Sequence, residues 1–583
     1  MRTTFCAALA AAACVAAAGT ASAHQNHIGI ESEKPGEVYT LLKAPRTAAK
    51  TTGSVDLQLL TVSDWHGQLE PLVVNNVPLG GGAALKTYFD QARSANPNTL
   101  TFMAGDSVGA TPPVSSFFED TPAIEVMNRM GIDADTLGNH NFDAGIGRLQ
   151  QQAQLADFPF LSANLKGLEE TVPGASKRRF FSVGGVRVAV IGITNEEAPT
   201  LVAPGSFGPL EVTDGLAAAE KAARQARSAG AEVVVILTHK GIRSIAGTSA
   251  SGELVDFSSA LTPGLVDVVV GDHTDFAYSE TFPNGVLAVE NRSKGATFAK
   301  VQLTVARRSG VTSKGVTIQE AKAAAVPADP GIAQYIADRK AALQPILGQV
   351  IGQSPVQILR SDSCGRSDGR LCESRIGDVV TDALRTTYGT DFALTNSGGL
   401  RDNLTCQNAG GAGFCPNPLP ATPPFLVTKG TVVAVLPFGN QSATTSLSGA
   451  ELRQFLETSV KDMPSVNGRF AQVSGLCFTY DIQLPPGSRV TSTVRPAADG
   501  SCTGETIAPA TTYTLATNDF VAAGGDGYPN IKDRTTTRDL MDADLARYVA
   551  DASPLDPGVR GRIVCIDSNT AVAPACPTTT VAP

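Results

Sequence analysis

The sequence lacks the features of a nucleic-acid-binding protein, a membrane protein or a cysteine-zinc protein. Its 46 Lys and Arg and 55 Asp and Glu residues are interspersed without a basic block, and the net charge is −9. A nucleic-acid polymer is therefore not an expected partner. After the N-terminal segment no apolar run is long enough for a membrane span, and no C-x-x-C motif occurs. We expect a globular protein that, without its N-terminal segment, is long enough for two hydrophobic cores and too long for one.

The N-terminal segment has the features of a secretory signal. Arg2 precedes an Ala-rich apolar stretch, and Ala21, Ser22 and Ala23 provide a small-residue cleavage site. The stretch is too short and too poor in Leu and Ile for a membrane helix, and a lipoprotein site at Cys14 is a weaker alternative. We predict a signal peptide over 1–23, an extension over 24–54, and an exported protein that is periplasmic or extracellular.

Cysteine is absent between Cys14 and Cys364, and eight cysteines then follow in the second half of the chain. An even number of cysteines in an exported chain favours disulfides over metal binding. Proximity in the sequence favours four short disulfide loops, which pair Cys364 with Cys372, Cys406 with Cys415, Cys477 with Cys502, and Cys565 with Cys576.

Residues 55–326 repeat one pattern, in which a β-branched apolar run is followed by a polar turn and an Ala-rich helical stretch. The apolar runs lie at 57–62, 100–103, 186–193, 233–237 and 266–270, and a helix is expected over 215–229, ended by Gly230. This alternation predicts an α/β domain in which helices cover the faces of a sheet. Ligands of such domains bind just past the carboxyl ends of the strands.

The sequence pattern changes after this first domain. Residues 327–352 form a predicted linker helix, which Pro327 and Pro330 precede and Pro345 ends. Residues 353–566 alternate Cys-, Gly- and Pro-rich loops with apolar segments, such as 432–436, and a helix around 450–457. We therefore predict a second α/β domain, followed by a disordered tail over 567–583.

Histidine is scarce, with six in the chain, and four histidines lie in acidic or amide-containing motifs that follow apolar runs. The motifs are S-D-W-H-G with His66, G-N-H-N-F-D with His140, L-T-H-K with His239, and G-D-H-T-D with His273. Any one of these histidines alone is better explained as a polar residue at a strand end, but the four together favour a metal centre.

The neighbours of these histidines supply carboxylate and amide ligands. Asp64 and His66 are two residues apart, so both side chains point to one side if the preceding strand remains extended. Asp106 follows Gly105, which allows close backbone approach, and its two oxygens could bridge a pair of ions. Nitrogen and oxygen ligands without thiolate suit zinc, manganese, iron or cobalt in a two-metal centre for displacement at phosphorus.

The order D-x-H, G-D, G-N-H-x-F-D, T-H and G-x-H resembles the calcineurin-like metallophosphoesterases, specifically the exported 5′-nucleotidase and UDP-sugar hydrolase family. For the first domain the resemblance implies a four-layer α/β/β/α sandwich that binds two divalent ions. One ion would be held by Asp64, His66, Asp106 and Asp275, and the other by Asp106, Asn139, His239 and His273. His140 and Asp143 would form a catalytic dyad that stabilises the phosphoryl oxygens or protonates the leaving alkoxide.

Two positions depart from the family pattern. The family usually has His or Gln where Asp275 stands, so Asp275 adds negative charge to the centre. It usually has Glu where Asn141 stands, and Asn141 is expected to support the dyad rather than to bind metal.

The resemblance extends through residues 370–384, 395–401, 436–440, 473–476 and 518–528, and thus over nearly the whole mature chain. It implies a nucleotide-binding second domain in which Phe438 and Phe520 enclose the base and Asp526 accepts the ribose hydroxyls. The remaining predicted substrate residues are Arg366, Arg370, Asn396, Arg401 and Asn440. Because either Phe could instead be a core residue, and Arg366 and Arg370 could be solvated loop charges, these roles are hypotheses. With substrate on one domain and metal on the other, turnover would require domain movement about the linker helix.

The sequence thus predicts an exported dinuclear-metal hydrolase of nucleoside 5′-monophosphates, with UDP-sugars as further substrates, that acts by attack of metal-activated water. The alternatives are a 2′,3′-cyclic nucleotide 2′-phosphodiesterase with 3′-nucleotidase activity, a thiosulfohydrolase of related fold, and a nucleotide-binding surface protein without turnover. The sequence does not decide which of these four metals is bound, which base is preferred or which oligomeric state is formed.

Overall fold

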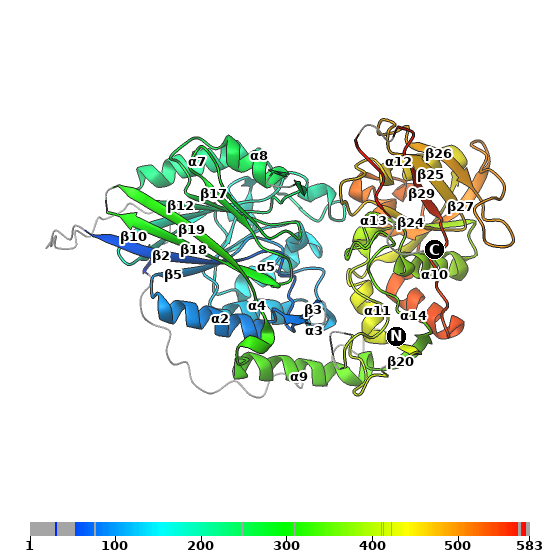
Figure 1. Ribbon diagram of the computed structural model, residues 1–583, viewed down its shortest axis with the longest axis horizontal. Helices are drawn as coiled ribbons and strands as arrows, with labels where there is room; N and C mark the ends of the chain where they lie inside the picture. Colours follow the sequence, from blue (N-terminus) through cyan, green and yellow to red (C-terminus); the bar gives the residue numbers. More distant parts are fainter. Residues whose placement is uncertain are drawn as a thin grey trace.

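The computed structural model describes residues 29–31, 53–74, 77–246, 249–307, 309–409, 411, 413–420, 422–569 and 573–578. The predicted signal peptide and most of the N-terminal extension lie outside these residues. Two α/β domains lie side by side, and helix α9 (Pro330–Leu347) runs along one edge of both (Figure 1).

Two sheets form the centre of the first domain. The seven-stranded sheet has the order β1-β9-β10-β12-β15-β17-β16, with β1 (Gly29–Glu31), β9 (Arg178–Val183), β10 (Val186–Ile193), β12 (Val233–Thr238), β15 (Val268–Gly271), β17 (Leu287–Glu290) and β16 (Tyr278–Thr281). The four-stranded sheet has the order β19-β18-β2-β5, with β19 (Gly310–Glu320), β18 (Thr297–Ala306), β2 (Ser54–Val62) and β5 (Thr99–Met103). The central strands β10, β12, β15 and β17 are parallel, as are β2 and β5.

The two sheets pack face to face, with helices on both outer faces. One apolar core, which includes Leu59, Phe102, Val190 and Val235, fills the space between the sheets. Helices α7 (Gly215–Ser228) and α8 (Glu253–Ala260) cover the seven-stranded sheet, and α2 (Gly82–Ala95), α4 (Thr121–Met130) and α5 (Gly145–Leu155) cover the other (Figure 1). This arrangement confirms the predicted four-layer α/β/β/α sandwich.

Shorter elements complete this domain. They are β3 (Leu72–Val74), β4 (Val77–Leu79), α3 (Pro113–Ser116), β6 (Asp135–Thr136), β7 (Phe160–Leu161), β8 (Leu165–Lys166), α6 (Leu168–Thr171), β11 (Glu211–Val212), β13 (Ser244–Ala246) and β14 (Ser249–Ser251). The local sequence explains the long elements well. For example, α7 begins where the Asp214 carboxylate accepts a hydrogen bond from Ala217 N–H and ends just before Gly230, whose φ is +89°.

The second domain is built on a mixed five-stranded sheet of order β24-β21-β27-β23-β28. Its strands are β24 (Ala471–Ser474), β21 (Phe392–Asn396), β27 (Thr512–Asn518), β23 (Gln441–Ser448) and β28 (Thr536–Leu540). Three further strands, β26 (Val490–Val494), β25 (Cys477–Asp481) and β29 (Ile563–Ile566), form a small sheet, and β20 (Val350–Ser354) pairs with β22 (Phe425–Thr428). The helices are α10 (Arg375–Tyr388), α11 (Lys429–Val435), α12 (Gly449–Ser459), α13 (Asp519–Ala522) and α14 (Met541–Ala552).

The linker helix differs from its prediction at its end. Asp329 accepts a hydrogen bond from Ile332 N–H and Pro330 is the first helical residue, so the predicted start is confirmed. Pro345 does not end the helix, which continues to Leu347. In the last turn a proline removes only one hydrogen bond, and burial of Leu343 and Leu347 against Phe414 of the second domain offsets that loss.

All four predicted disulfides are present, and all lie in the second domain or its tail. They join Cys364 to Cys372, Cys406 to Cys415, Cys477 to Cys502, and Cys565 to Cys576. Among the described residues, no helix combines the length and apolar character needed to cross a membrane.

Candidate metal centre and substrate cleft

The predicted ligands lie on loops that follow parallel strands. Asp64 and His66 follow β2, Asp106 follows β5, His239 follows β12 and His273 follows β15. The carboxyl ends of parallel strands meet at one edge of a sheet, and here two such edges meet because the sheets are stacked. Residues separated by more than 200 positions therefore converge on one point.

Left-handed backbone conformations aim several of these side chains. The φ angles are 43° at Asp64, 48° at His66, 42° at Asp106 and 86° at His273. Such conformations are uncommon for residues other than glycine and cluster at functional sites. The expectation that Asp64 and His66 continue an extended strand is wrong, because the chain turns after Val62. The turn still brings Asp64 Oδ1 to 3.7 Å from His66 Nε2.

His239 contacts every other member of one group of possible ligands. Its Nε2 lies 2.9 Å from Asp106 Oδ2, 3.1 Å from Asn139 Oδ1 and 3.0 Å from His273 Nδ1. The imidazole is fully buried. The structure thus brings together all four residues that were predicted to hold one ion.

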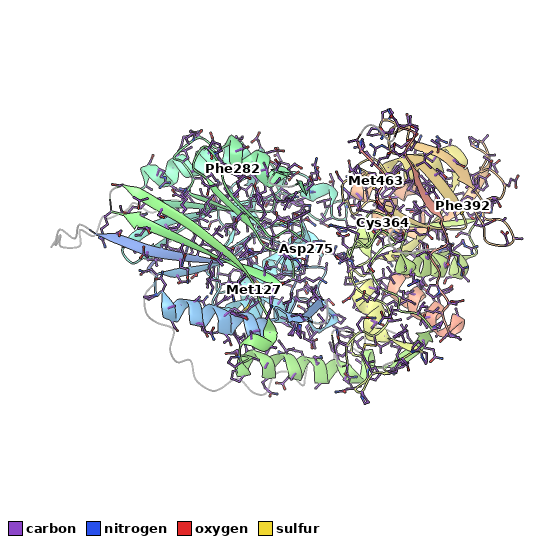
Figure 2. The ribbon with its side chains drawn as sticks, in the orientation of Figure 1. Met127, Asp275, Phe282, Cys364, Phe392 and Met463 are labelled. Atoms are coloured by element: carbon purple, nitrogen blue, oxygen red, sulfur yellow. A yellow bond between two sulfur atoms is a disulfide. The ribbon has the colours of Figure 1, made fainter. Side chains whose placement is uncertain are left out.

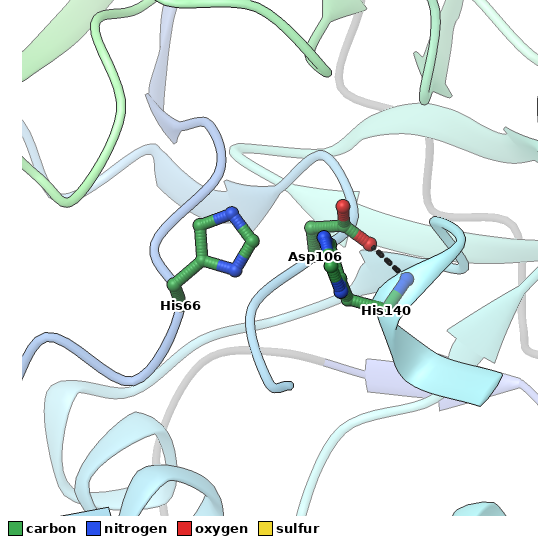
Figure 3. A group of neighbouring side chains, drawn as sticks. All are labelled: His66, Asp106 and His140. Atoms are coloured by element: carbon green, nitrogen blue, oxygen red, sulfur yellow. Dashed lines mark hydrogen bonds between the residues drawn. The ribbon is translucent and has the colours of Figure 1, made fainter. Parts of the chain in front are cut away.

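His66, Asp106 and His140 form a second group, in which one ligand atom from each lies within 4.8 Å of the others (Figure 3). His66 Nδ1 donates a hydrogen bond to Gly109 O at 2.9 Å, so its Nε2 is the nitrogen left for a ligand. Asp64, His66 and Asp106, three of the four residues predicted to hold the other ion, therefore lie close together.

Asp275, the fourth member of that set, does not join a group of possible ligands among the described residues. Its Oδ1 accepts hydrogen bonds from Ser293 N–H at 3.0 Å and Ser293 Oγ–H at 3.2 Å, and it lies 3.6 Å from Arg292 Nε. Asp275 lies at the edge of the first domain that faces the second (Figure 2). Its role as a ligand stays a prediction.

The predicted dyad is assembled. His140 Nδ1 lies 2.8 Å from Asp143 Oδ2, and the backbone N–H of His140 donates to Asp106 Oδ1 at 2.8 Å. Both side chains keep some solvent contact, with 13% of His140 and 22% of Asp143 exposed. Asn141 is buried, and its Oδ1 accepts a hydrogen bond from Gly138 N–H at 2.9 Å. Asn141 therefore holds the loop that carries the dyad.

Buried groups around Asp106 hold its loop in place. Asp135 accepts hydrogen bonds from Gly105 N–H at 3.0 Å and from the hydroxyl of Ser107. Gly105 has a φ of +104°, and a Cβ at this position would lie 2.8 Å from His239 Nδ1. The predicted close approach at Gly105 is confirmed, since neither the conformation nor the space permits a side chain.

A divalent cation fits this arrangement. Burial raises the pKa of Asp64 well above its ordinary value, and it raises the pKa of Asp272 to about 6. Buried carboxylates of this kind are costly when ionised unless a positive charge compensates them. The donors are nitrogen and oxygen atoms that lie within 4.8 Å of one another. Such a set suits zinc, manganese, iron or cobalt rather than a soft thiophilic ion.

A cleft of about 1020 Å³ between the domains contains the predicted substrate residues. Its lining from the second domain includes all eight of them: Arg366, Arg370, Asn396, Arg401, Phe438, Asn440, Phe520 and Asp526. Its lining from the first domain includes His66, Asp106, His140 and Asp143. The cleft therefore joins the metal centre to the nucleotide residues that were predicted from the second half of the chain.

Aromatic side chains link the two walls of the cleft. The ring of Phe438 stacks on the ring of His140, with centroids 5.6 Å apart and an interplanar angle of 12°. The Arg401 guanidinium lies 5.7 Å from the centroid of the same phenyl ring. Phe438 and Phe520 are both half-buried and line the cleft, and Phe520 also packs against the core of the second domain.

The polar residues predicted to bind substrate differ in how many hydrogen bonds their side chains already make within the protein. Asn396 Nδ2 donates to Asp526 Oδ2 at 2.7 Å, and Asn440 Nδ2 donates to Asp519 Oδ1 at 2.7 Å. Within the described part of the chain, Arg370 Nε is buried without a hydrogen-bond acceptor.

The predicted arginines also differ in whether an acidic partner engages their guanidinium group. Arg366 is engaged by Asp368 through its Nε and Nη2 atoms, at 3.1 and 2.9 Å. Burial and the neighbouring Arg360 and Arg370 lower the pKa of Arg401 to about 9, which indicates crowded positive charge. Such crowding favours an anionic ligand.

Sequence reasoning missed three residues at this site. Lys294 and Arg360 add positive charge to the cleft, and Asp272 lies within the metal centre. Asp272 directly precedes His273 in the motif G-D-H-T-D, which was a usable signal. Lys294 and Arg360 lie in loops without a distinctive pattern.

Comparisons with known proteins agree with this geometry. Residues 350–533 match the family model described as the C-terminal domain of 5′-nucleotidase. Endonuclease YhcR of Bacillus subtilis is 26% identical and aligns with 80% of this chain, which spans only 37% of that protein. Snake venom 5′-nucleotidase of Naja atra is 28% identical, with 88% of this chain and 99% of the relative covered. The crystal structure of a 5′-nucleotidase precursor from Thermus thermophilus superposes with a TM-score of 0.75 at 25% identity, over 88% of this chain and 99% of that one.

The fold and the ligand groups together define a two-domain calcineurin-like metallophosphoesterase. The match to the C-terminal domain model and the similarity to whole 5′-nucleotidases narrow this class. The C-terminal region thus matches the 5′-nucleotidase domain model, and the chain is similar over most of its length to whole 5′-nucleotidases.

Proposed function

We propose that this chain is an exported, dinuclear-metal phosphohydrolase that removes phosphate from nucleoside 5′-monophosphates, with UDP-sugars as a second substrate class. The observation that carries the proposal is the stack of Phe438 on His140, at 5.6 Å. It joins an aromatic side chain suited to a base with an imidazole suited to phosphoryl chemistry, across the boundary between two domains. Four disulfides favour export, because such bonds persist in oxidising compartments.

The first domain would provide the reaction centre. Asp64, His66, Asp106 and Asp275 would hold one ion, and Asp106, Asn139, His239 and His273 the other. When bound, the ions would neutralise phosphate charge and supply an activated water as nucleophile. The Nδ1–H group of His140 donates to Asp143 at 2.8 Å, which leaves Nε2 to hold a proton for the departing ribose oxygen.

The second domain would bind the substrate. Phe438 and Phe520 would stack on the base, and Asp526 would accept the ribose hydroxyls. Arg370 and Arg401 would bind the phosphate, because their guanidinium groups face the cleft with few partners among the described residues. The remaining predicted residues, Arg366, Asn396 and Asn440, would support this site through the hydrogen bonds they already make.

Substitution of one stacking residue tests whether the cleft recognises a nucleoside. Aromatic stacking is worth roughly 1 to 3 kcal/mol per base, so Phe520→Ala should raise KM for 5′-AMP by about 5- to 150-fold. The same variant should hydrolyse p-nitrophenyl phosphate at the wild-type rate, because that substrate has no base. The exposed Phe117, which is outside the cleft, provides the control Phe117→Ala. Equal losses on both substrates would contradict base stacking by Phe520.

A panel of substrates separates the remaining alternatives. Phosphate release should be measured from 5′-AMP, UDP-glucose, 2′,3′-cyclic AMP and 3′-AMP, with and without chelator. For UDP-glucose, a phosphatase added afterwards frees the phosphate of the products. We expect chelator-sensitive release that is fastest from 5′-AMP. Preference for the cyclic or 3′ substrates would favour the phosphodiesterase, and release from none would favour a binding protein without turnover.

A further inference from the structure

Asp272 is a buried carboxylate of the candidate metal centre and directly precedes the predicted ligand His273. It follows strand β15 directly and is fully buried. Its backbone N–H donates to Lys240 O at 3.1 Å, which fixes the loop after β15 against the loop after β12. These are the two loops that carry His273 and His239.

The two oxygens of Asp272 face these two histidines separately. Oδ1 accepts a hydrogen bond from the backbone N–H of His273 at 2.9 Å. Oδ2 lies 3.5 Å from Nδ1 of His239. Among the described residues, neither that oxygen nor that nitrogen makes a regular hydrogen bond, and the carboxylate of Asp64 also lies against that of Asp272. One carboxylate therefore contacts both predicted histidine ligands of the same ion.

The position of the His239 ring makes the second contact important. Its Nε2 faces Asp106, Asn139 and His273, so Nε2 must present a lone pair if it is to bind an ion. A neutral imidazole with a free Nε2 carries its proton on Nδ1. The side chain placed to accept that proton in a hydrogen bond is Asp272, because Gly105 closes the approach to the same nitrogen.

The first contact supports a strained backbone. His273 has a φ of 86°, a conformation that side-chain-bearing residues rarely adopt. A hydrogen bond from its N–H to the preceding aspartate stabilises this local turn. The turn brings His273 Nδ1 to 3.0 Å from His239 Nε2.

We propose that Asp272 is a positioning residue that orients both histidine ligands of one ion, by accepting the Nδ1–H of His239 and the backbone N–H of His273. The proposal rests on the metal centre of the proposed function. Removal of the hydrogen-bond partner of a metal-bound histidine commonly lowers metal affinity or activity by about 10- to 100-fold. Since one ligand atom each of Asp64, His239 and Asp272 also lies within 4.8 Å of the others, direct coordination by Asp272 is the competing explanation.

The isosteric variant Asp272→Asn distinguishes these explanations. An amide has one acceptor oxygen and one donor group, so it cannot accept from both histidines. If its oxygen stays on His273 N–H, its NH₂ group faces His239 Nδ1 and favours the tautomer in which Nε2 carries the proton. We therefore expect zinc affinity at this site to fall by about 10- to 100-fold, although the shape of the side chain is unchanged.

Two measurements test the proposal without any substrate. Competition with a chromophoric chelator gives the affinity for each zinc ion, and ¹⁵N-histidine spectra of the metal-free and zinc-loaded protein give the tautomer of His239. The control is Asp267→Asn, at the residue just before the same strand, where the carboxylate accepts from Val234 N–H at 2.9 Å and contacts no histidine of the described residues. We expect weaker binding of one ion and a changed His239 tautomer in Asp272→Asn, with wild-type values in Asp267→Asn.

Two outcomes would overturn the proposal. Wild-type zinc affinity and tautomer in Asp272→Asn would mean that Asp272 does not orient His239. Weaker zinc binding with an unchanged His239 tautomer in the metal-free protein would identify Asp272 as a direct ligand. Because neither measurement uses a nucleotide, failure here is distinct from failure of the proposed nucleotidase activity.

Discussion

Replacement of His140 by alanine separates two roles that the structure permits for this side chain. His140 contributes to a dyad with Asp143 at 2.8 Å, but its ring also lies close enough to His66 and Asp106 to be a metal ligand. The one hydrogen bond from His140 to Asp106 comes from the backbone N–H, which alanine retains. His140→Ala therefore removes the dyad while leaving this support of Asp106 in place.

The expected loss follows from the chemistry of the dyad. Proton transfer by a positioned side chain contributes about 10²- to 10⁴-fold, which corresponds to about 3 to 5 kcal/mol of transition-state stabilisation. The ring is 87% shielded from solvent, since 13% is exposed, so bulk water would be a poor substitute for it. We expect kcat for 5′-AMP to fall by two to four orders of magnitude with little change in KM, because binding depends on the second domain.

Metal content and kinetics measured on the same preparation check this account. Zinc or manganese per chain should remain at the wild-type value in His140→Ala, and Asp143→Asn should show a smaller loss of kcat. If His140→Ala loses an ion, then His140 is a ligand and its assignment to the dyad is wrong.

Two further predictions concern metal binding and stability. In Gly138→Ala the new Cβ would lie 2.2 Å from Asp106 Oδ1, so metal content should fall sharply, whereas Gly147→Ala, which has open space, should bind metal normally; equal metal content in both would contradict the steric argument. Burial raises the pKa of Asp133 from its ordinary value to about 6, so its protonated form stabilises the fold below about pH 4 and this contribution is lost as pH rises through 6. Asp133→Asn should therefore gain about 2 kcal/mol relative to wild type in urea unfolding at pH 7.5 but little at pH 4, after allowance for the partial solvent contact of Asp133. An equal difference at both pH values would refute the role of burial.

The sequence predicted the first domain well because its strands are long and continuously apolar. Strand β10 has the predicted bounds, Val186–Ile193, and the polar motifs after β2, β5, β12 and β15 contain the residues that the structure brings together as a candidate metal centre. The left-handed turns at Asp64 and His66 could not be predicted, since residues with side chains adopt them only when the surrounding structure compensates the strain.

In the second domain, local sequence patterns predicted less of the structure than in the first. The apolar segment 432–436, to which the sequence assigned neither helix nor strand, falls mostly in helix α11, because a short apolar run does not distinguish the two. Phe438 and Phe520 could be assigned only through family resemblance, because an isolated Phe in a loop has no distinctive spacing. The same holds for Asp272, whose contact with His239 depends on how two loops of the folded chain meet.

Phosphate release from 5′-AMP by the metal-loaded protein tests the central claim most directly. The account predicts release that stops when a chelator removes the ions and returns when zinc or manganese is restored. Absence of release from 5′-AMP by a folded protein with both ions bound would contradict it.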